Sequence, residues 1–280
     1  ALRGMPEDFN EWADLGNNEW NWESVLPEFK RLERDLDFGN EPYHGDSGPI
    51  TIRRYPRGEL LPQHQAFIES AKLLGYPYCA DATDPDGWGA GPQPMNKLGR
   101  LRISSAIAYL APIRVRPNLT IQPNTLVRRL VTDGHTCRGV EVEDNEGNIE
   151  IISGKLVVLS TGSLMTPPIL MRSGIGPAPQ LEAFGIDIVQ AEPGVGSNLC
   201  DHPAISLVCQ VKNGAIIDFD APIIQTILRY TTEGSDKRND MQIEQFSYVG
   251  REGGPPLFGI PACLEYQYGR GEIRLRSANP

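Results

Sequence analysis

The sequence contains no apolar run that approaches the ~20 residues of a membrane-spanning helix. It is also poor in positive charge, since 26 Lys and Arg stand against 36 Asp and Glu and give a net charge of -10. This balance argues against nucleic acid or an anionic membrane as a partner. The first residues, ALRGMPEDFNEW, lack the basic and apolar segments of a signal peptide, so we expect none in this chain.

Sequence motifs for metal binding and thiol redox chemistry are missing as well. The 5 cysteines are odd in number and form no C-x-x-C pair, and the 4 histidines show no ligand-like spacing. We therefore expect no metal site and free thiols, which favour a reducing, cytoplasmic compartment. The cysteines are Cys79, Cys137, Cys200, Cys209 and Cys263.

The remaining composition is that of a globular protein. Hydrophobic residues make up 40% of the chain, and 29 Gly and 24 Pro indicate many turns. A chain of 280 residues has room for about two domains.

The most informative stretch is LVVLSTGSLMTPPILMRSGIG, residues 156–176. Its apolar, β-branched start at 156–159 predicts a buried parallel strand. The turn that follows consists of Thr161, Gly162 and Ser163, whose small side chains would let a ligand approach the main chain. Such a turn by itself more often only connects two elements.

A short helix is predicted after this turn. Thr166 offers a capping hydroxyl, Pro167 suits the first helical position, and Gly174 suits the left-handed end of the helix. The predicted unit is therefore strand, turn and helix.

The whole string resembles the second signature of the glucose-methanol-choline (GMC) family of flavin-dependent alcohol oxidoreductases. The agreement comes from Gly162-Ser163, Thr166-Pro167, Ile169-Leu170 and Ser173-Gly174-Ile175-Gly176. Further strings similar to the family begin at Arg3-Gly4, at Gly99-Arg100 and at Pro193-Gly194, the last running to Pro203.

This resemblance implies a mixed fold, α/β and α+β. We expect part of an FAD-binding Rossmann-like domain from residues 1–46 and 96–204. Residues 47–95 and 205–280 would form a substrate-binding domain with an antiparallel sheet and helices.

Periodicity predicts most of the elements. The predicted helices are 24–36 (capped by Ser24), 62–74, 179–184 and 223–230. The predicted strands are 116–121, 126–131, 186–189, 205–211, 241–249, 262–268 and 272–276, with a hairpin of 137–142 and 149–152.

The resemblance also implies which residues approach FAD. Val127 would present its backbone to the adenine, although its side chain would pack in either case. Thr161, Gly162 and Ser163 would lie close to the cofactor, and Asn198 and His202 are weaker candidates. We assign no catalytic base, because the family's catalytic histidine lies nearer the C-terminus and His202, followed by Pro203, is more often structural.

Two parts of the family pattern are absent: a G-x-G-x-x-G after an N-terminal strand, and the C-terminal histidine segment. We therefore expect this chain to be the middle portion of a family member, a fragment of a longer product or a degenerate one. The implied function is FAD-dependent oxidation of the CH-OH group of a small alcohol by hydride transfer to flavin.

Two other functions remain open. The chain could be a non-catalytic remnant that keeps the sheet as a binding or interaction module. It could also be a nicotinamide-linked dehydrogenase, which only the strand-turn-helix unit favours. The sequence does not identify the alcohol, the electron acceptor or the oligomeric state.

Overall fold

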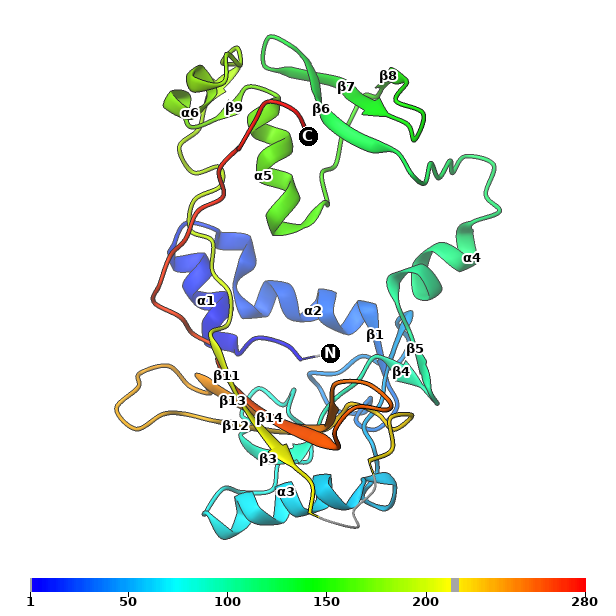
Figure 1. Cartoon of the computed structure of the whole chain (residues 1–280), viewed down its shortest axis with the longest axis vertical. Coiled ribbons are helices and arrows are strands. Elements are labelled where there is room, and N and C mark those ends of the chain that lie inside the picture. The colour runs from blue at the N-terminus through cyan, green and yellow to red at the C-terminus, as the bar shows by residue number, and fades with distance from the viewer. Residues whose placement is uncertain (1, 213–216) are drawn as a thin grey trace. The chain divides into compact units, whose positions relative to one another are not determined.

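A computed structural model describes residues 2–212 and 217–280 and divides the chain into two compact units (Figure 1). Unit 1 comprises residues up to 119 together with 202–266, and unit 2 comprises 120–201 together with 267–280. Both units combine helices with antiparallel strands, so the mixed fold class is confirmed.

The two units do not have the boundaries of the two expected domains. Unit 1 contains the expected substrate segment 47–95 and the part of 205–280 up to residue 266, but also residues 1–46, 96–119 and 202–204, which we assigned to the flavin domain. Residues 267–280 of the expected substrate domain belong to unit 2. Residues 120–201 are the only part of the expected flavin domain in unit 2. The compact units are defined by contacts between residues of this chain. The expected domains are defined by the ligand that each would bind, so that division stays a prediction.

Unit 1 begins with two helices, α1 (Pro6–Asp14) and α2 (Trp22–Leu32), joined through a 3-10 turn. The ring of Phe9 packs against those of Trp12, Trp22 and Phe29 with centroid distances of 5.5, 5.8 and 5.5 Å. These aromatic residues therefore hold α1 against α2.

Helix α2 is capped by Asn21. The sequence had predicted a cap at Ser24. The Asn21 side chain accepts a hydrogen bond from the Ser24 N–H at 3.0 Å. The helix ends at Leu32, earlier than predicted, because the chain continues as strand β1 (Glu33–Asp35) and pairs in parallel with β2 (Ile50–Ile52). Pairing with a distant strand overrides the helical periodicity.

The main sheet of unit 1 is antiparallel throughout, in the order β11-β14-β13-β12-β3. These five strands are labelled in Figure 1. The strand predictions for 205–211 and 241–249 are confirmed, whereas the strand predicted at 262–268 begins earlier. The strands are β3 (Gly89–Pro92), β11 (Ala204–Gln210), β12 (Ile224–Tyr230), β13 (Met241–Val249) and β14 (Leu257–Leu264).

Two predictions near this sheet are wrong. Residues 223–230 were expected to be helical but form strand β12, and residues 272–276 form no strand. The centre of β12 is buried throughout, so its apolar residues do not alternate with exposed ones. A short buried run has no clear period, and a central strand then resembles a buried helix.

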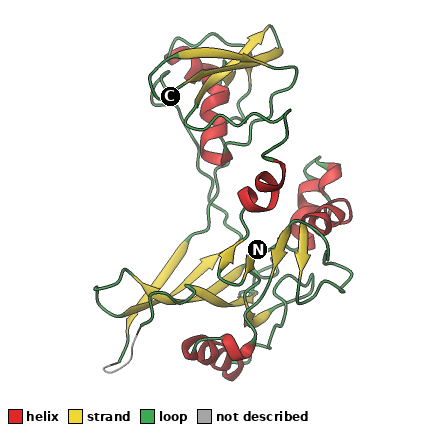
Figure 2. Cartoon of the chain, turned by 90° about the vertical axis from the view of Figure 1, so that its right-hand side faces the viewer, coloured by secondary structure: helices red, strands yellow, loops and turns green. Residues whose placement is uncertain are grey.

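Helix α3 (Pro62–Leu73) is confirmed, and Gly75 follows it with φ +94°. It lies along one face of the sheet (Figures 1 and 2). The buried His64 joins the two, since its ring nitrogens contact Thr226 Oγ1 at 2.8 Å and Ser247 Oγ at 2.9 Å. Burial lowers the pKa of His64 to about 4, so the ring is neutral near pH 7.

The remainder of unit 1 consists of small elements. Strands β4 (Lys97–Leu98) and β5 (Leu101–Arg102) form a two-stranded ladder, and a π-helical turn precedes the short α4 (Ala111–Ile113). The strand predicted at 116–121 is not formed.

Unit 2 is built on an antiparallel sheet of β6 (Leu126–Asp133), β7 (Thr136–Glu143) and β8 (Ile149–Ser153). The predicted strand at 126–131 and the predicted hairpin are confirmed. Helix α5 (Gly162–Arg172) contacts β6.

The other elements of unit 2 gather around a small core of Met171, Leu181 and Leu275. Helix α6 (Ala178–Ala183) confirms the prediction for 179–184. The strand predicted at 186–189 is displaced to β10 (Gln190–Ala191), which pairs in parallel with β9 (Ile175–Gly176).

The start of the 156–176 stretch differs from the prediction. Residues 156–159 form no strand, and the side chains of Leu156 and Val158 are 82% and 75% exposed. Residues 2–212 and 217–280 supply no strand to pair with this run, and an apolar parallel strand forms only where both of its faces are covered.

Helix α5 begins at Gly162, so Pro167 and Pro168 lie inside it rather than at its first position. A proline has no N–H, so the carbonyl groups four residues earlier, those of Ser163 and Leu164, lose their intrahelical partners. Gly174, with φ +81°, follows the end of the helix as predicted.

Three features expected from the composition can be compared with the described residues. All five cysteines are free. Within residues 2–212 and 217–280 we find no grouping of His, Cys, Asp and Glu suited to a metal ion. No helix in these ranges has the length and apolar character to cross a membrane.

Candidate functional site

The start of helix α5 presents exposed main chain in unit 2. Thr161 occupies the capping position but makes no capping hydrogen bond, and its hydroxyl lies 2.8 Å from that of Thr166. Gly162 has φ +83°, and apart from its chain neighbours and the adjacent helix backbone no atom lies within 4 Å of where its Cβ would stand. The first N–H groups of a helix lack intrahelical partners and carry partial positive charge, so this end suits an anionic group.

An open depression of about 470 Å³ lies beside this helix start. Helix α5 forms one wall of the depression, and the loop of residues 194–200 forms the other. The depression is open to solvent. The lining residues are Ser163, Pro167, Leu170, residues 194–200 and Ile273.

The loop of residues 194–200 packs closely against its neighbours in unit 2. A Cβ on Gly196 would lie 2.5 Å from the Ile273 carbonyl oxygen and 2.5 Å from Met171 Cε, so only glycine fits there. Asn198 also has positive φ, +59°, and lines the depression. The glycine thus fixes the course of the loop that presents Asn198.

Val127 lies near one end of β6, opposite Val142 of β7. Because β6 is an edge strand of its sheet, the backbone groups of alternate residues point away from β7. The strand is fixed to α5 by two hydrogen bonds: the Leu130 N–H donates to Ser173 Oγ at 2.8 Å, and Arg172 Nε donates to the Arg128 carbonyl at 2.8 Å.

The structure therefore brings most of the predicted cofactor residues into one unit. Thr161, Gly162 and Ser163 form the start of α5, and Asn198 lies with Ser163 around the depression. Val127 lies on the strand that α5 contacts. The sixth residue, His202, belongs to unit 1.

In unit 1, His202 lies at the beginning of a polar region of the main sheet. Its Nε2 is 3.4 Å from Glu265 Oε2, and its side chain is 54% exposed. Burial raises the pKa of Glu265, and the neighbouring His202 and Arg229 oppose that shift. His202 thus pairs with a carboxyl group whose ionisation is weakened by burial.

A second carboxyl group, that of Glu244 on β13, lies on this polar sheet face. Its Oε1 accepts hydrogen bonds from Gln93 Nε2 at 2.9 Å and from Gln242 Nε2 at 3.1 Å. Burial raises the pKa of Glu244. Cys263 of β14 pairs with Gln242 of β13, the residue that donates to Glu244. Burial raises the pKa of the Cys263 thiol, and the charges of Glu265 and Glu244 add to this shift.

Sequence reasoning missed Glu244 and Glu265. The alternation of residues 241–249 indicated which side chains share a face, but polar residues at every second position are also typical of a solvent-exposed face. In the folded chain both residues are partly buried, Glu244 within β13 and Glu265 directly after β14, which alternation alone does not show.

Unit 1 also contains a buried ionic cluster centred on His44. Its Nδ1 lies 2.7 Å from Glu33 Oε1 and its Nε2 lies 2.8 Å from Asp81 Oδ2. Burial lowers the pKa of His44, but hydrogen bonds to Asp81 and Glu33 outweigh it and raise the pKa to about 9. The imidazole is therefore cationic at neutral pH.

Two arginines complete this ionic cluster. Arg54 donates from Nη1 to both carboxylate oxygens of Asp35, at 3.0 and 2.8 Å, and from Nη2 to Asp81 at 2.5 Å. Arg3 forms an ion pair with Glu33. Three cations thus balance three carboxylates. The charged members are Arg3, Glu33, Asp35, His44, Arg54 and Asp81, each between 3% and 8% exposed.

Comparison with known proteins identifies the family. A family profile described as GMC oxidoreductase matches residues 1–204. The chain belongs to the GMC oxidoreductase family. An uncharacterized GMC-type oxidoreductase of Rhodococcus erythropolis is 34% identical over 100% of this chain and 55% of its own length. The 5-(hydroxymethyl)furfural oxidase of a Methylovorus species is 37% identical over 77% of this chain and 41% of its own.

Solved structures of this family have the same fold. The pyridoxine 4-oxidase from Mesorbium loti superposes with a TM-score of 0.86 at 26% identity, covering 100% of this chain and 56% of that chain. Formate oxidase from Aspergillus oryzae, at 21% identity and a TM-score of 0.85, supports the fold alone. The chain spans about half the length of the relatives that it matches, or less.

GMC oxidoreductases are FAD-dependent flavoproteins, so FAD is the cofactor that the family implies. The residues of unit 2 fit one part of such a group. The helix start at Gly162 has open space above it and no side-chain cap, and the depression beside it exposes main chain and small side chains. The G-x-G-x-x-G turn that would hold the pyrophosphate is not in this sequence.

Proposed function

We propose that this chain forms part of an FAD-dependent enzyme that oxidises the CH-OH group of a small alcohol. In this reaction the hydroxyl proton leaves to a base and the carbon loses a hydride, so the alcohol becomes a carbonyl compound. FAD supplies the acceptor for that hydride. The support comes from the family match over residues 1–204 together with the exposed start of α5.

The residues of unit 2 would bind the cofactor in this proposal. The main chain at Thr161, Gly162 and Ser163 would approach it closely, and Asn198 would border the same site. Val127 would contact the adenine through its backbone. These assignments stay proposals, supported by the exposed N–H groups of α5 and the edge position of β6.

The polar sheet face of unit 1 would bind the substrate. Glu244 already accepts two hydrogen bonds and lies partly buried, so it can accept a further one from a substrate hydroxyl. Glu265, held near His202, offers a second acceptor. We assign no residue of this chain as the base.

The experiment uses the protein as its gene encodes it. We expect it to be purified with FAD, identified by its absorbance spectrum and by release on denaturation. Under anaerobic conditions, addition of an alcohol should bleach the visible flavin band. The alcohols to test are those in the names of two relatives, 5-(hydroxymethyl)furfural and pyridoxine.

Several results would contradict this proposal. Bound NAD in place of FAD would favour the nicotinamide-linked alternative. A folded protein that binds no flavin would favour the non-catalytic module. Bound FAD that no alcohol reduces, but that dithionite reduces normally, would reject alcohol oxidation while keeping the cofactor assignment.

A further inference from the structure

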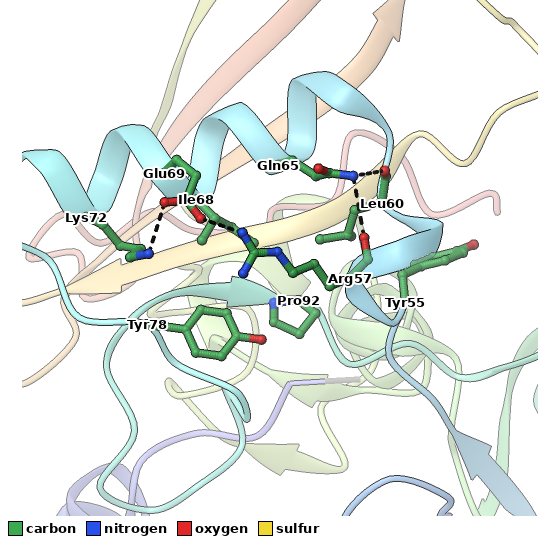
Figure 3. Close-up of a pocket in the computed structure, with 9 residues that line it drawn as sticks. All are labelled: Tyr55, Arg57, Leu60, Gln65, Ile68, Glu69, Lys72, Tyr78 and Pro92. Carbon is green, nitrogen blue, oxygen red and sulfur yellow. Dashed lines mark hydrogen bonds and ion pairs between the residues drawn. The ribbon is translucent and has the colours of Figure 1, made fainter.

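A pocket of about 300 Å³ opens beside helix α3 in unit 1 (Figure 3). It lies on the α3 side of the main sheet, where Pro92 pairs with Thr226 and Thr226 contacts His64 of the helix. Neighbouring residues on a strand point to opposite faces, so Ile227 and its partner Glu244 point to the other side. The pocket is therefore distinct from the polar sheet face.

The floor of this pocket is apolar. Leu60 and Ile68 are only 6% and 5% exposed, and Pro92 is buried. Tyr78 forms one wall, and this residue is 55% exposed. A floor of this kind suits a flat apolar group that packs against the tyrosine ring.

The rim of the pocket is charged. The Glu69 carboxylate bridges two cations: its Oε1 accepts from Arg57 Nη2 at 3.1 Å and its Oε2 from Lys72 Nζ at 2.9 Å. Figure 3 shows Arg57 reaching across the pocket between α3 and Tyr78. Two cations against one carboxylate leave the rim with an excess of one positive charge, in a chain whose net charge is -10.

The rim also keeps hydrogen-bond donors for a ligand. A guanidinium carries five N–H donors and an ammonium carries three. Among the described residues, Glu69 is the acceptor for both side chains, through one nitrogen of Arg57 and through Lys72 Nζ. Arg57 can therefore hold a second carboxylate while it stays paired with Glu69.

We propose that this pocket binds a small organic monoanion that carries a flat ring, of the aromatic carboxylate class. The ring would lie on Ile68 and Pro92 beside Tyr78, and the carboxylate would bind Arg57 and Lys72. The volume lies at the lower end of the range for ligand pockets, roughly 300 Å³, which suits a single ring.

Calorimetric titration of the full-length protein with three probes of one ring size tests this proposal. The probes are benzoate, benzyl alcohol and benzylamine, which carry a negative, a neutral and a positive group. We expect benzoate to bind at least tenfold more tightly than benzyl alcohol, with benzylamine the weakest. Equal binding of benzoate and benzyl alcohol, or no binding of benzoate, would overturn the proposal.

Two variants with opposite expected effects locate the site. Arg57→Gln should weaken benzoate binding about tenfold, whereas Glu69→Gln should strengthen it severalfold, because it removes the competing carboxylate. A gain of affinity cannot arise from misfolding. Arg138→Gln is the matched control, since Arg138 is also an exposed arginine in a surface ion pair, with Asp133 at 3.1 Å. Unchanged binding in Arg57→Gln or weaker binding in Glu69→Gln would reject this pocket.

Discussion

The start of helix α5 in unit 2 and the ionic cluster around His44 in unit 1 use polar groups in opposite ways. At α5, no side chain caps the helix and the main chain at Gly162 is open. Around His44, the three cations and three carboxylates are buried and bonded to one another. An unsatisfied group at the surface is available to a ligand, whereas a charged group buried among its ion-pair partners stabilises the fold.

The largest expected effect comes from opening the buried cluster. Asp81→Ala removes the partner of both His44 and Arg54 and leaves two buried cations without enough negative charge. We expect the free energy of unfolding to fall by about 3–5 kcal/mol, the usual result of breaking a buried pair from one side. Urea denaturation followed by circular dichroism measures the loss.

Asp133→Ala is the control for that variant. Asp133 also pairs with an arginine, Arg138, but the two side chains are 77% and 60% exposed. Its removal should change the free energy of unfolding by less than about 0.5 kcal/mol. Equal losses in the two variants would show that burial does not distinguish the cluster from a surface ion pair.

The second expected effect is a dependence of stability on pH. The pKa of His44 rises from 6.5 to about 9 on folding, so its contribution is complete below pH 6.5 and is lost as the pH rises through 9. Between pH 7 and pH 9 the loss should be about 2–3 kcal/mol. His64 has the opposite effect, because folding lowers its pKa from 6.5 to about 4. The free energy of unfolding therefore decreases through His64 only as the pH falls below 6.5.

Denaturation midpoints measured from pH 7 to pH 9 test this dependence. His44→Gln should remove most of the slope, because glutamine has no proton to lose in this range. His135→Gln replaces an exposed histidine and should keep the slope of the parent protein. A slope that survives in His44→Gln would assign it to another group.

The third expected effect concerns the exposed main chain at the start of helix α5. Gly162 and Gly147 have φ of +83° and +84°, and a Cβ on either would meet no atom within 4 Å beyond the neighbouring backbone. Alanine at either position should cost about 1 kcal/mol of stability through backbone strain alone. If the main chain at Gly162 touches FAD, only Gly162→Ala should also weaken FAD binding, by about tenfold. Fluorescence titration with FAD measures this, and equal affinities in both variants would remove Gly162 from the proposed site.

The same contrast explains what could be predicted from the sequence. The family motif from Gly162 to Gly176 lies within one short segment, so its spaced residues indicated the family. Gly174 in the same segment marked the place directly after the end of α5. The hairpin of 137–142 and 149–152 was equally local, with its turn residues between alternating strands. Local patterns of this kind survive in the folded chain because few distant contacts compete with them.

Nonlocal features could not be predicted in this way. The cluster joins Arg3, Glu33, His44, Arg54 and Asp81, which no sequence spacing relates. The same holds for the partly buried carboxyl groups of the sheet face, which depend on strand register. Where pairing decides the structure, as at 223–230, periodicity alone gave the wrong element.

The smallest expected effect concerns the cap of helix α2, which the sequence predicted at Ser24 and the structure has at Asn21. Asn21 Oδ1 accepts the Ser24 N–H at 3.0 Å, and Asn21 Nδ2 donates to the Asn18 carbonyl at 2.8 Å. Asn21→Ala should therefore lower the free energy of unfolding by about 1 kcal/mol, whereas Ser24→Ala, in the position that the sequence favoured, should change it little. Both residues lie near the surface, so the comparison in urea isolates the cap from packing. A larger loss from Ser24→Ala would restore the predicted start of the helix and place Asn21 outside it.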